Sequence, residues 1–174
     1  IAQLKKRFNN VSEVRVDLTT VFEDFKNVVP NIETSSKVNL SLANTRARLR
    51  MTSLYYFAGL HGLLVAGTGN KVEDFGVGFY TKYGDGGVDV SPIADLMKSE
   101  VYLVSEFLEV PKSIQKAAPT DGLFGDSRTD EEQIGASYDE LEWAMKMKDA
   151  GKTAKDFHDR EKEVFKIYTR LNKM

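Results

Sequence analysis

Hydrophobic positions recur along most of this chain with the spacing of amphipathic helices. The longest run predicts a helix over residues 39–60, where small and apolar residues return every three or four positions. Shorter runs of the same kind predict further helices over residues 1–9, 19–29, 96–110 and 153–171, with others starting near 112 and 137. Pro30 and Pro111 mark the end of one helix and the first turn of another.

Two segments show the patterns of β-strands. Residues 13–18, EVRVDL, alternate apolar and polar side chains, and residues 62–68, GLLVAGT, form a compact apolar run that ends in Gly-Thr. The order helix, strand, helix, helix, strand predicts an α/β fold with a parallel sheet. A helix followed at once by a strand is the second half of a βαβ unit, so we expect an N-terminal strand to be missing ahead of Ile1.

Composition narrows the class of protein. The 174 residues, 41% hydrophobic and 29% charged, predict a single domain over 1–174. A net charge of -2 argues against a broad nucleic-acid surface, and no apolar run has the length of a membrane span. The absence of cysteine excludes disulfides and thiolate chemistry within these residues and fits a cytoplasmic location.

Candidate chemistry lies around the glycine-rich stretch 67–87. Carboxylates and lysines among its glycines suit a magnesium-bound polyphosphate, because backbone N–H groups approach a ligand closely where no Cβ intervenes. The alternative is a solvated, turn-rich loop. Three arginines, Arg46, Arg48 and Arg50, either bind a ligand or form a solvated helix face, and Arg48 points away from the other two.

Several motifs resemble the ammonia-dependent NAD synthetases. They are NTRARLRM, GLLVAGTGNKVE, GFYTKYGDGGVDVSPIADLMK, APTDGL and DEEQIGASYDELE, which occur in that family's order over residues 37–142. The resemblance implies a three-layer αβα fold of the Rossmann-like ATP pyrophosphatase type with a central parallel sheet. It also implies ATP-dependent amidation of deamido-NAD by ammonia, through a deamido-NAD adenylate, with release of AMP and pyrophosphate.

The resemblance also implies roles for individual residues. Positions matching Thr68, Lys98 and Thr120 bind ATP in the family, and the position matching Glu73 binds Mg²⁺. Positions matching Arg48, Lys82 and Asp89 bind deamido-NAD.

Three departures from the family pattern stand out. Gly69-Asn70 replaces an Asp-His pair found in many members, and one extra residue lies between Glu73 and Phe79. The Ser-Gly-Gly-x-Asp-Ser phosphate loop and a C-terminal His-Lys pair do not occur in these residues. We therefore expect a chain that is incomplete at both ends and inactive alone.

The family also implies a homodimer and free ammonia as the nitrogen source, since these residues hold neither a cysteine nucleophile nor a glutaminase domain. Two alternatives stay open. One is another ligase of the ATP pyrophosphatase type, acting on a different carboxylate or a nucleobase. The other is an inactive nucleotide-binding or dimerisation module.

Overall fold

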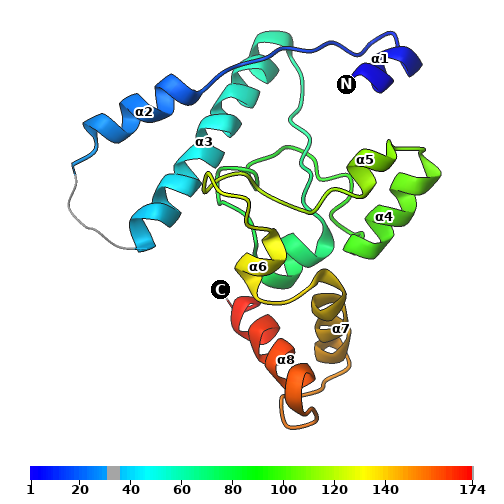
Figure 1. Ribbon diagram of the computed structural model, residues 1–174. Coiled ribbons are helices and arrows are strands. Elements are labelled where there is room, and N and C mark those ends of the chain that lie inside the picture. Colours follow the sequence, from blue (N-terminus) through cyan, green and yellow to red (C-terminus); the bar gives the residue numbers. More distant parts are fainter. Residues whose placement is uncertain (31–35, 174) are drawn as a thin grey trace. The chain divides into compact units, whose positions relative to one another are not determined.

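The computed structural model describes residues 1–30 and 36–173 and divides the chain into two compact units, residues 1–34 and 35–174. The first unit holds helices α1 (Ala2–Arg7) and α2 (Thr19–Val28). The second holds the other elements (Figure 1): α3 (Ser36–His61), η1 (Val72–Val77), α4 (Lys98–Phe107), α5 (Lys112–Gln115), α6 (Asp130–Ile134), α7 (Tyr138–Asp149) and α8 (Asp159–Leu171).

In the first unit, the prediction of a strand over residues 13–18 is wrong. This segment has no regular secondary structure, and Val14 and Val16 are exposed. Alternation alone does not make a strand, because the backbone groups of a strand need a neighbour to bond. Helix α2 begins as predicted at Thr19, whose N–H donates to Asp17 Oδ1 at 2.9 Å.

The second predicted strand, residues 62–68, is reduced to one parallel bridge between Ala66 and Val90. The Gly67 N–H donates to the Val90 carbonyl at 2.7 Å, and Val65 is buried beside it. Leu63 and Leu64 are exposed. Residues 1–30 and 36–173 contain no strand longer than this bridge. The bridge is therefore the only part of the predicted sheet that these residues form.

Helix α3 confirms the prediction for residues 39–60. Ala43 and Ala47 are buried on it, and Leu123 packs against them in a small apolar cluster. None of the helices in the described part of the chain combines the length and apolar composition needed to cross a bilayer.

Element η1 is a π-helix, in which an N–H group bonds to the carbonyl five residues back and not four. Its last turn closes on the Glu73 carbonyl, which receives the N–H groups of both Gly78 and Phe79, the latter at 2.9 Å. π-helical turns frequently lie at functional sites.

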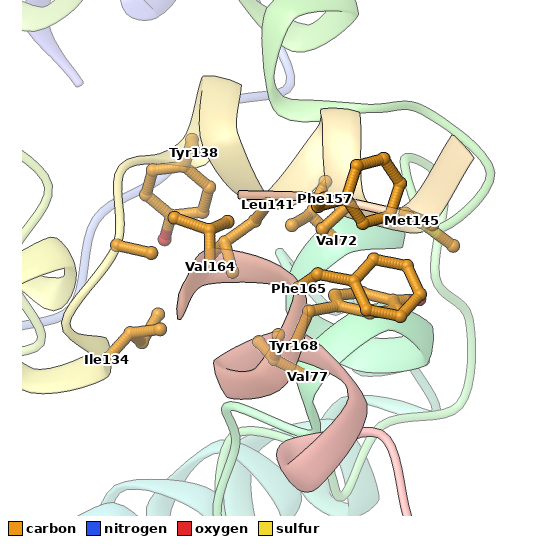
Figure 2. Packing of buried hydrophobic residues seen from close by; sticks show 12 residues of the cluster. Val72, Val77, Ile134, Tyr138, Leu141, Met145, Phe157, Val164, Phe165 and Tyr168 are labelled. Carbon is orange, nitrogen blue, oxygen red and sulfur yellow. The ribbon is translucent and has the colours of Figure 1, made fainter. Parts of the chain in front are cut away.

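The main core joins η1 to the last three helices (Figure 2). Helices α7 and α8 lie side by side (Figure 1), and Leu141, Val164 and Tyr168 are almost fully buried between them and η1. The amide of Asn172, which follows α8, donates to the carbonyls of Phe75 and Gly76 at 3.0 and 2.7 Å. The C-terminal helix is therefore tied to η1 by packing and by hydrogen bonds.

The last helix begins later than predicted, at Asp159 and not at Thr153. The Thr153 N–H and hydroxyl both donate to Asp156 Oδ2, at 2.7 and 2.9 Å, which closes a local turn before the helix. Side chains such as threonine and aspartate compete with helices in this way. Phe157 nevertheless packs in the core, where the centre of its ring lies 4.8 Å from the centre of the Trp143 ring.

Candidate functional site

An ion pair between Glu73 and Lys98 joins η1 to the first residue of α4. Lys98 Nζ lies 3.0 Å from Glu73 Oε1, and the two side chains are only 18% and 15% exposed. A partly buried pair of this kind is shielded from salt more than a surface pair is. The structure thus places two predicted site residues, one from the ATP set and one from the magnesium set, in direct contact.

Local hydrogen bonds hold Glu73 in place. Asn70 Oδ1 accepts the N–H groups of Val72 and Glu73 at 3.0 and 3.1 Å, and Glu73 Oε2 accepts the Asn70 N–H at 3.3 Å. Asn70 is 2% exposed, so its side chain is a buried cap for the start of η1. The Asn70 that departs from the family pattern therefore has a structural role.

The start of α4 is fixed from two sides. The Lys71 N–H donates to the Leu96 carbonyl at 2.8 Å, which brings the segment before η1 next to the segment before Lys98. The buried Glu142 carboxylate on α7 accepts both the N–H and the hydroxyl of Ser99 at 2.8 Å. Carboxylates stabilise helix N-termini, so Glu142 anchors the helix that carries Lys98.

Tyr138, the first residue of α7, completes the Glu73–Lys98 pair. Its hydroxyl donates to Glu73 Oε1 at 2.6 Å, and Lys98 Nζ lies 4.5 Å from the centre of its ring. Tyr138 is 5% exposed, and burial, followed by the bond to Glu73, raises the pKa of its hydroxyl far above the usual range. The hydroxyl is therefore a neutral donor at any physiological pH.

A further carboxylate, Asp130, lies behind Tyr138. Its Oδ2 is 3.4 Å from the Tyr138 hydroxyl, while Oδ1 is buried without a hydrogen-bond partner among the described residues. Burial raises the pKa of Asp130, and the nearby Asp121 and Glu73 carboxylates raise it further. Asp130 therefore keeps its proton to a higher pH than an exposed aspartate does.

The two predicted threonines lie in segments that border this centre. Thr68 is exposed and follows Gly67, which bonds at the parallel bridge. Thr120 is exposed between Pro119, whose carbonyl accepts the Asp130 N–H at 3.0 Å, and Asp121. Both hydroxyls are accessible to a ligand.

The three residues predicted to bind deamido-NAD lie on a loop and on the helix beside it. Residues 81–89 run along one face of α3: Arg48 Nε donates to the Lys82 carbonyl at 3.2 Å, and Gly87 lies against Met51. Tyr55, one helical turn beyond Met51, hydrogen-bonds to Asp89, and desolvation, followed by this bond, raises the pKa of the Tyr55 hydroxyl.

Asp89 is also bonded to the segment that carries the bridge. Its Oδ2 accepts the Val65 N–H at 2.8 Å, and its own N–H donates to the Val65 carbonyl at 2.9 Å. The Lys82 ammonium lies 5.1 Å from the Tyr83 ring, and both side chains are exposed. The Arg48 and Lys82 side chains therefore both lie at the surface, and the Asp89 carboxylate is hydrogen-bonded to the Val65 backbone.

Glycines in this loop allow the close packing. A Cβ on Gly84 would meet Ala47 and Thr81 at 2.9 Å, and a Cβ on Gly86 would meet the Tyr80 ring at 2.5 Å. The loop is therefore held against α3, although its turns leave the Lys82 and Asp85 side chains exposed. Asp85 reinforces it by accepting the Thr81 N–H at 3.0 Å.

The other two arginines of α3 bind a different loop. Arg46 bonds to the Leu123 carbonyl, and Arg50 donates to the carbonyls of Asp121 and Gly122 at 3.2 and 3.4 Å. The expected separation of Arg48 from this pair is confirmed. The two loops that flank the proposed ligands are thus fixed to different sides of one helix.

The described residues do not form a complete metal site. Among residues 1–30 and 36–173, no three His, Cys, Asp or Glu side chains lie close enough together to hold an ion. Glu73 Oε1 is bonded to Lys98 and Tyr138, and Oε2 to Asn70. Glu73 could therefore bind a metal ion only if one of these donors, such as the Lys98 ammonium, left its carboxylate oxygen.

Comparison with known proteins defines the class: residues 3–174 match the NAD synthase family model, and the chain belongs to this family. The NH(3)-dependent NAD(+) synthetase of Methanococcoides burtonii is 41% identical over 144 residues, which are 82% of this chain and 53% of that protein. The corresponding enzyme of Thermoplasma acidophilum is 46% identical over 102 residues, 59% of this chain and 42% of that protein. The chain spans about half the length of these curated relatives.

Solved structures agree with the family. The NMN synthetase of Francisella tularensis superposes with a TM-score of 0.78 and 28% identity, over 94% of this chain and 62% of that one. An NH3-dependent NAD synthetase of Campylobacter jejuni superposes with a TM-score of 0.64 at 24% identity, over 91% and 58% of the two chains, and shows likeness of fold alone.

Sequence reasoning missed Tyr138 and Asp130 as members of the site. Both residues lie in the quoted motif DEEQIGASYDELE, and neither was given a role there. Each stands near a capping box, with Thr129 and Glu132 bonding each other's backbone before α6, and Ser137 and Glu140 doing so before α7. These boxes predict where the helices start, but contact with Glu73 across 65 positions leaves no local signal.

Proposed function

We propose that the full-length protein amidates deamido-NAD to NAD, with ATP and ammonia as the other substrates. The nicotinate carboxylate would attack the α-phosphorus of ATP and release pyrophosphate, and ammonia would then displace AMP from the adenylate with loss of a proton. The observation that carries this proposal is membership of the NAD synthase family over residues 3–174.

The ATP side of the proposed site is the Glu73–Lys98 centre with the exposed Thr68 and Thr120. Departing pyrophosphate gains negative charge, so a cation fixed in advance stabilises the transition state. Lys98 supports this role because it is held at the start of α4 before any ligand binds. The threonine hydroxyls would add neutral hydrogen bonds to the nucleotide.

The deamido-NAD side is the α3 face with Arg48, Lys82 and Asp89. The exposed Arg48 and Lys82 cations suit the pyrophosphate and carboxylate groups of this substrate, which are both anionic. Holding the carboxylate in line with the α-phosphate would lower the entropic cost of the first step.

Mg²⁺ is a proposed companion of ATP, with Glu73 as its ligand. Magnesium is usually held by one or two carboxylates together with phosphate oxygens, so a complete protein cage is not required. For Glu73 to serve, Lys98 must leave Oε1 when the nucleotide enters. Titrating Mg²⁺ against ATP binding to the wild type and to a Glu73→Gln variant tests this assignment.

The finer structural expectations are also proposals. We infer that residues 1–174 belong to one synthetase domain of a three-layer αβα protein with a parallel sheet. A homodimer is supported by apolar side chains exposed along α3, namely Leu54, Tyr56 and Leu60. Light scattering tests the dimer, and fractionation of cells tests the proposed cytoplasmic location.

The decisive assay incubates full-length protein with ATP, ammonium and deamido-NAD, with nicotinate mononucleotide as a competing substrate. We expect NAD and AMP in equal amounts from deamido-NAD. Amidation of the mononucleotide instead would favour the alternative of a ligase for another carboxylate, in line with the similarity to an NMN synthetase. Binding of ATP without any turnover would favour the inactive nucleotide-binding module.

A further inference from the structure

Tyr138 contacts both members of the Glu73–Lys98 pair through different parts of its side chain. The hydroxyl lies 2.6 Å from Glu73 Oε1, and the ring centre lies 4.5 Å from Lys98 Nζ. The hydroxyl limits where the carboxylate can lie, and the π face attracts the ammonium. One buried side chain therefore restricts the positions of an anion on η1 and a cation on α4.

We propose that Tyr138 is the positioning residue of the ATP side and that Asp130 fixes Tyr138 from behind. This inference rests on the proposed function, because it assigns Lys98 to the phosphates of ATP. Tyr138 needs no contact with substrate in this role: it acts through Glu73 and Lys98. The same ring packs into the main core, which keeps it rigid (Figure 2).

Hydrogen bonds hold the backbone of Tyr138 at the start of α7. Tyr138 begins α7, where the Ser137 hydroxyl accepts the Glu140 N–H at 3.2 Å and Glu140 accepts the Ser137 N–H at 2.9 Å. Glu131 on α6 accepts the Tyr138 N–H at 2.8 Å. Both ends of the Tyr138 residue, backbone and hydroxyl, are therefore held by separate elements.

Asp130 is the second carboxyl group beside the Tyr138 hydroxyl. A tyrosine hydroxyl has one hydrogen, and the 2.6 Å contact directs it to Glu73. The same hydroxyl also lies 3.4 Å from Asp130 Oδ2, the longer of its two contacts with a carboxyl group. The buried Asp130 side chain therefore borders the Tyr138 hydroxyl and limits where it can lie.

Two Tyr138 variants separate the two contacts. Tyr138→Phe keeps the ring under Lys98 and removes the bond to Glu73, while Tyr138→Leu removes both. For NAD formation by the full-length protein, we expect Tyr138→Phe to lower kcat about tenfold with little change in the KM for ATP. Tyr138→Leu should lower kcat further and raise that KM several-fold. Tyr102→Phe, which removes a hydroxyl from an exposed tyrosine on α4, is the matched control and should change neither.

Trace labelling of lysines with acetic anhydride tests the positioning without any activity. Relative to the exposed Lys112, Lys98 should be labelled several times faster in Tyr138→Leu than in wild type, with Tyr138→Phe between them. Equal labelling of Lys98 in wild type and Tyr138→Leu would overturn the proposal. Altered labelling in a protein that makes no NAD would reject the proposed function and leave the positioning intact.

Asp130 is tested by a conservative pair. Asp130→Asn retains a hydrogen-bonding side chain of the same shape beside Tyr138 and should keep kcat within about threefold of wild type, whereas Asp130→Ala should behave like Tyr138→Phe. An Asp130→Ala protein with wild-type kcat and wild-type Lys98 labelling would remove Asp130 from the assignment.

Discussion

Glu73 Oε1 receives two donors at once, the Lys98 ammonium at 3.0 Å and the Tyr138 hydroxyl at 2.6 Å. These three residues come from η1, α4 and α7, so their meeting depends on the packing of the whole second unit. The fold thus holds the Lys98 ammonium and the Glu73 carboxylate in a fixed arrangement.

Replacing Lys98 with alanine tests the ATP side. We expect Lys98→Ala in the full-length protein to lower kcat by about 10²–10³, because a preplaced cation against pyrophosphate is lost. Steady-state NAD formation measures the effect, and Lys112→Ala, at an exposed lysine paired with Glu106, serves as the control. Near-normal turnover of a folded Lys98→Ala protein would remove Lys98 from the ATP site.

Arg50 and Arg48 make a matched pair for the two loops on α3. Arg50→Met should raise hydrogen exchange in residues 120–123, since the bonds to the Asp121 and Gly122 carbonyls are lost. Arg48→Met should leave that loop unchanged and loosen residues 81–83 instead. Equal effects of both variants on both loops would contradict the division of the helix into two faces.

Asn172 should stabilise the π-helix. Its amide bonds two carbonyls of η1, so Asn172→Ala is expected to lower the free energy of unfolding by about 1–2 kcal/mol. Asn172→Asp keeps an acceptor for Lys148 but cannot donate to η1, and it should cost a similar amount. If chemical denaturation shows that Asn172→Asp is as stable as wild type, the bonds to η1 do not matter.

The Arg160–Glu140 pair should make stability depend on pH in acid. Arg160 lies 2.7 Å from Glu140 and lowers the pKa of that carboxyl from its usual 4.5 to about 2. The stabilisation is therefore present above pH 4.5 and is lost as pH falls toward 2. The pair is half exposed, so its loss should lower Tm by only about 1–3 °C.

Glu140→Gln isolates this charge, because its amide oxygen still accepts the Ser137 N–H. The Tm difference from wild type should be constant from pH 5 to 7, shrink as pH falls through 2, where wild-type Glu140 is half charged, and vanish below it. Calorimetry over this range measures it. A difference as large at pH 2 as at pH 7 would assign the effect to shape and not to charge.

The sequence predicted local features well and long-range contacts poorly. The long helix at α3 and the helix that starts near residue 137 follow from periodicity, which is a signal within a few residues. The strand prediction for residues 13–18 failed because alternation does not supply a pairing partner. The π-helix at η1 was not predicted, and it depends on tertiary contacts such as that of Asn172.

For the candidate site too, the sequence predicted some residues and missed the contacts that join distant segments. Family motifs identified Glu73 and Lys98 as site residues, and the structure brings these two into contact. Tyr138 lies at the start of the helix predicted near residue 137, and it packs in the core. Its second role through the hydroxyl could not be read from periodicity, which reports a side chain's face and not what its polar end meets.

Incubation of the full-length protein with deamido-NAD, ATP and ¹⁵N-ammonium, followed by mass spectrometry, tests the central claim most directly. The account predicts NAD with one ¹⁵N atom in its amide and one AMP for each NAD formed. Unchanged deamido-NAD, with ATP intact and no ¹⁵N in any product, would contradict it.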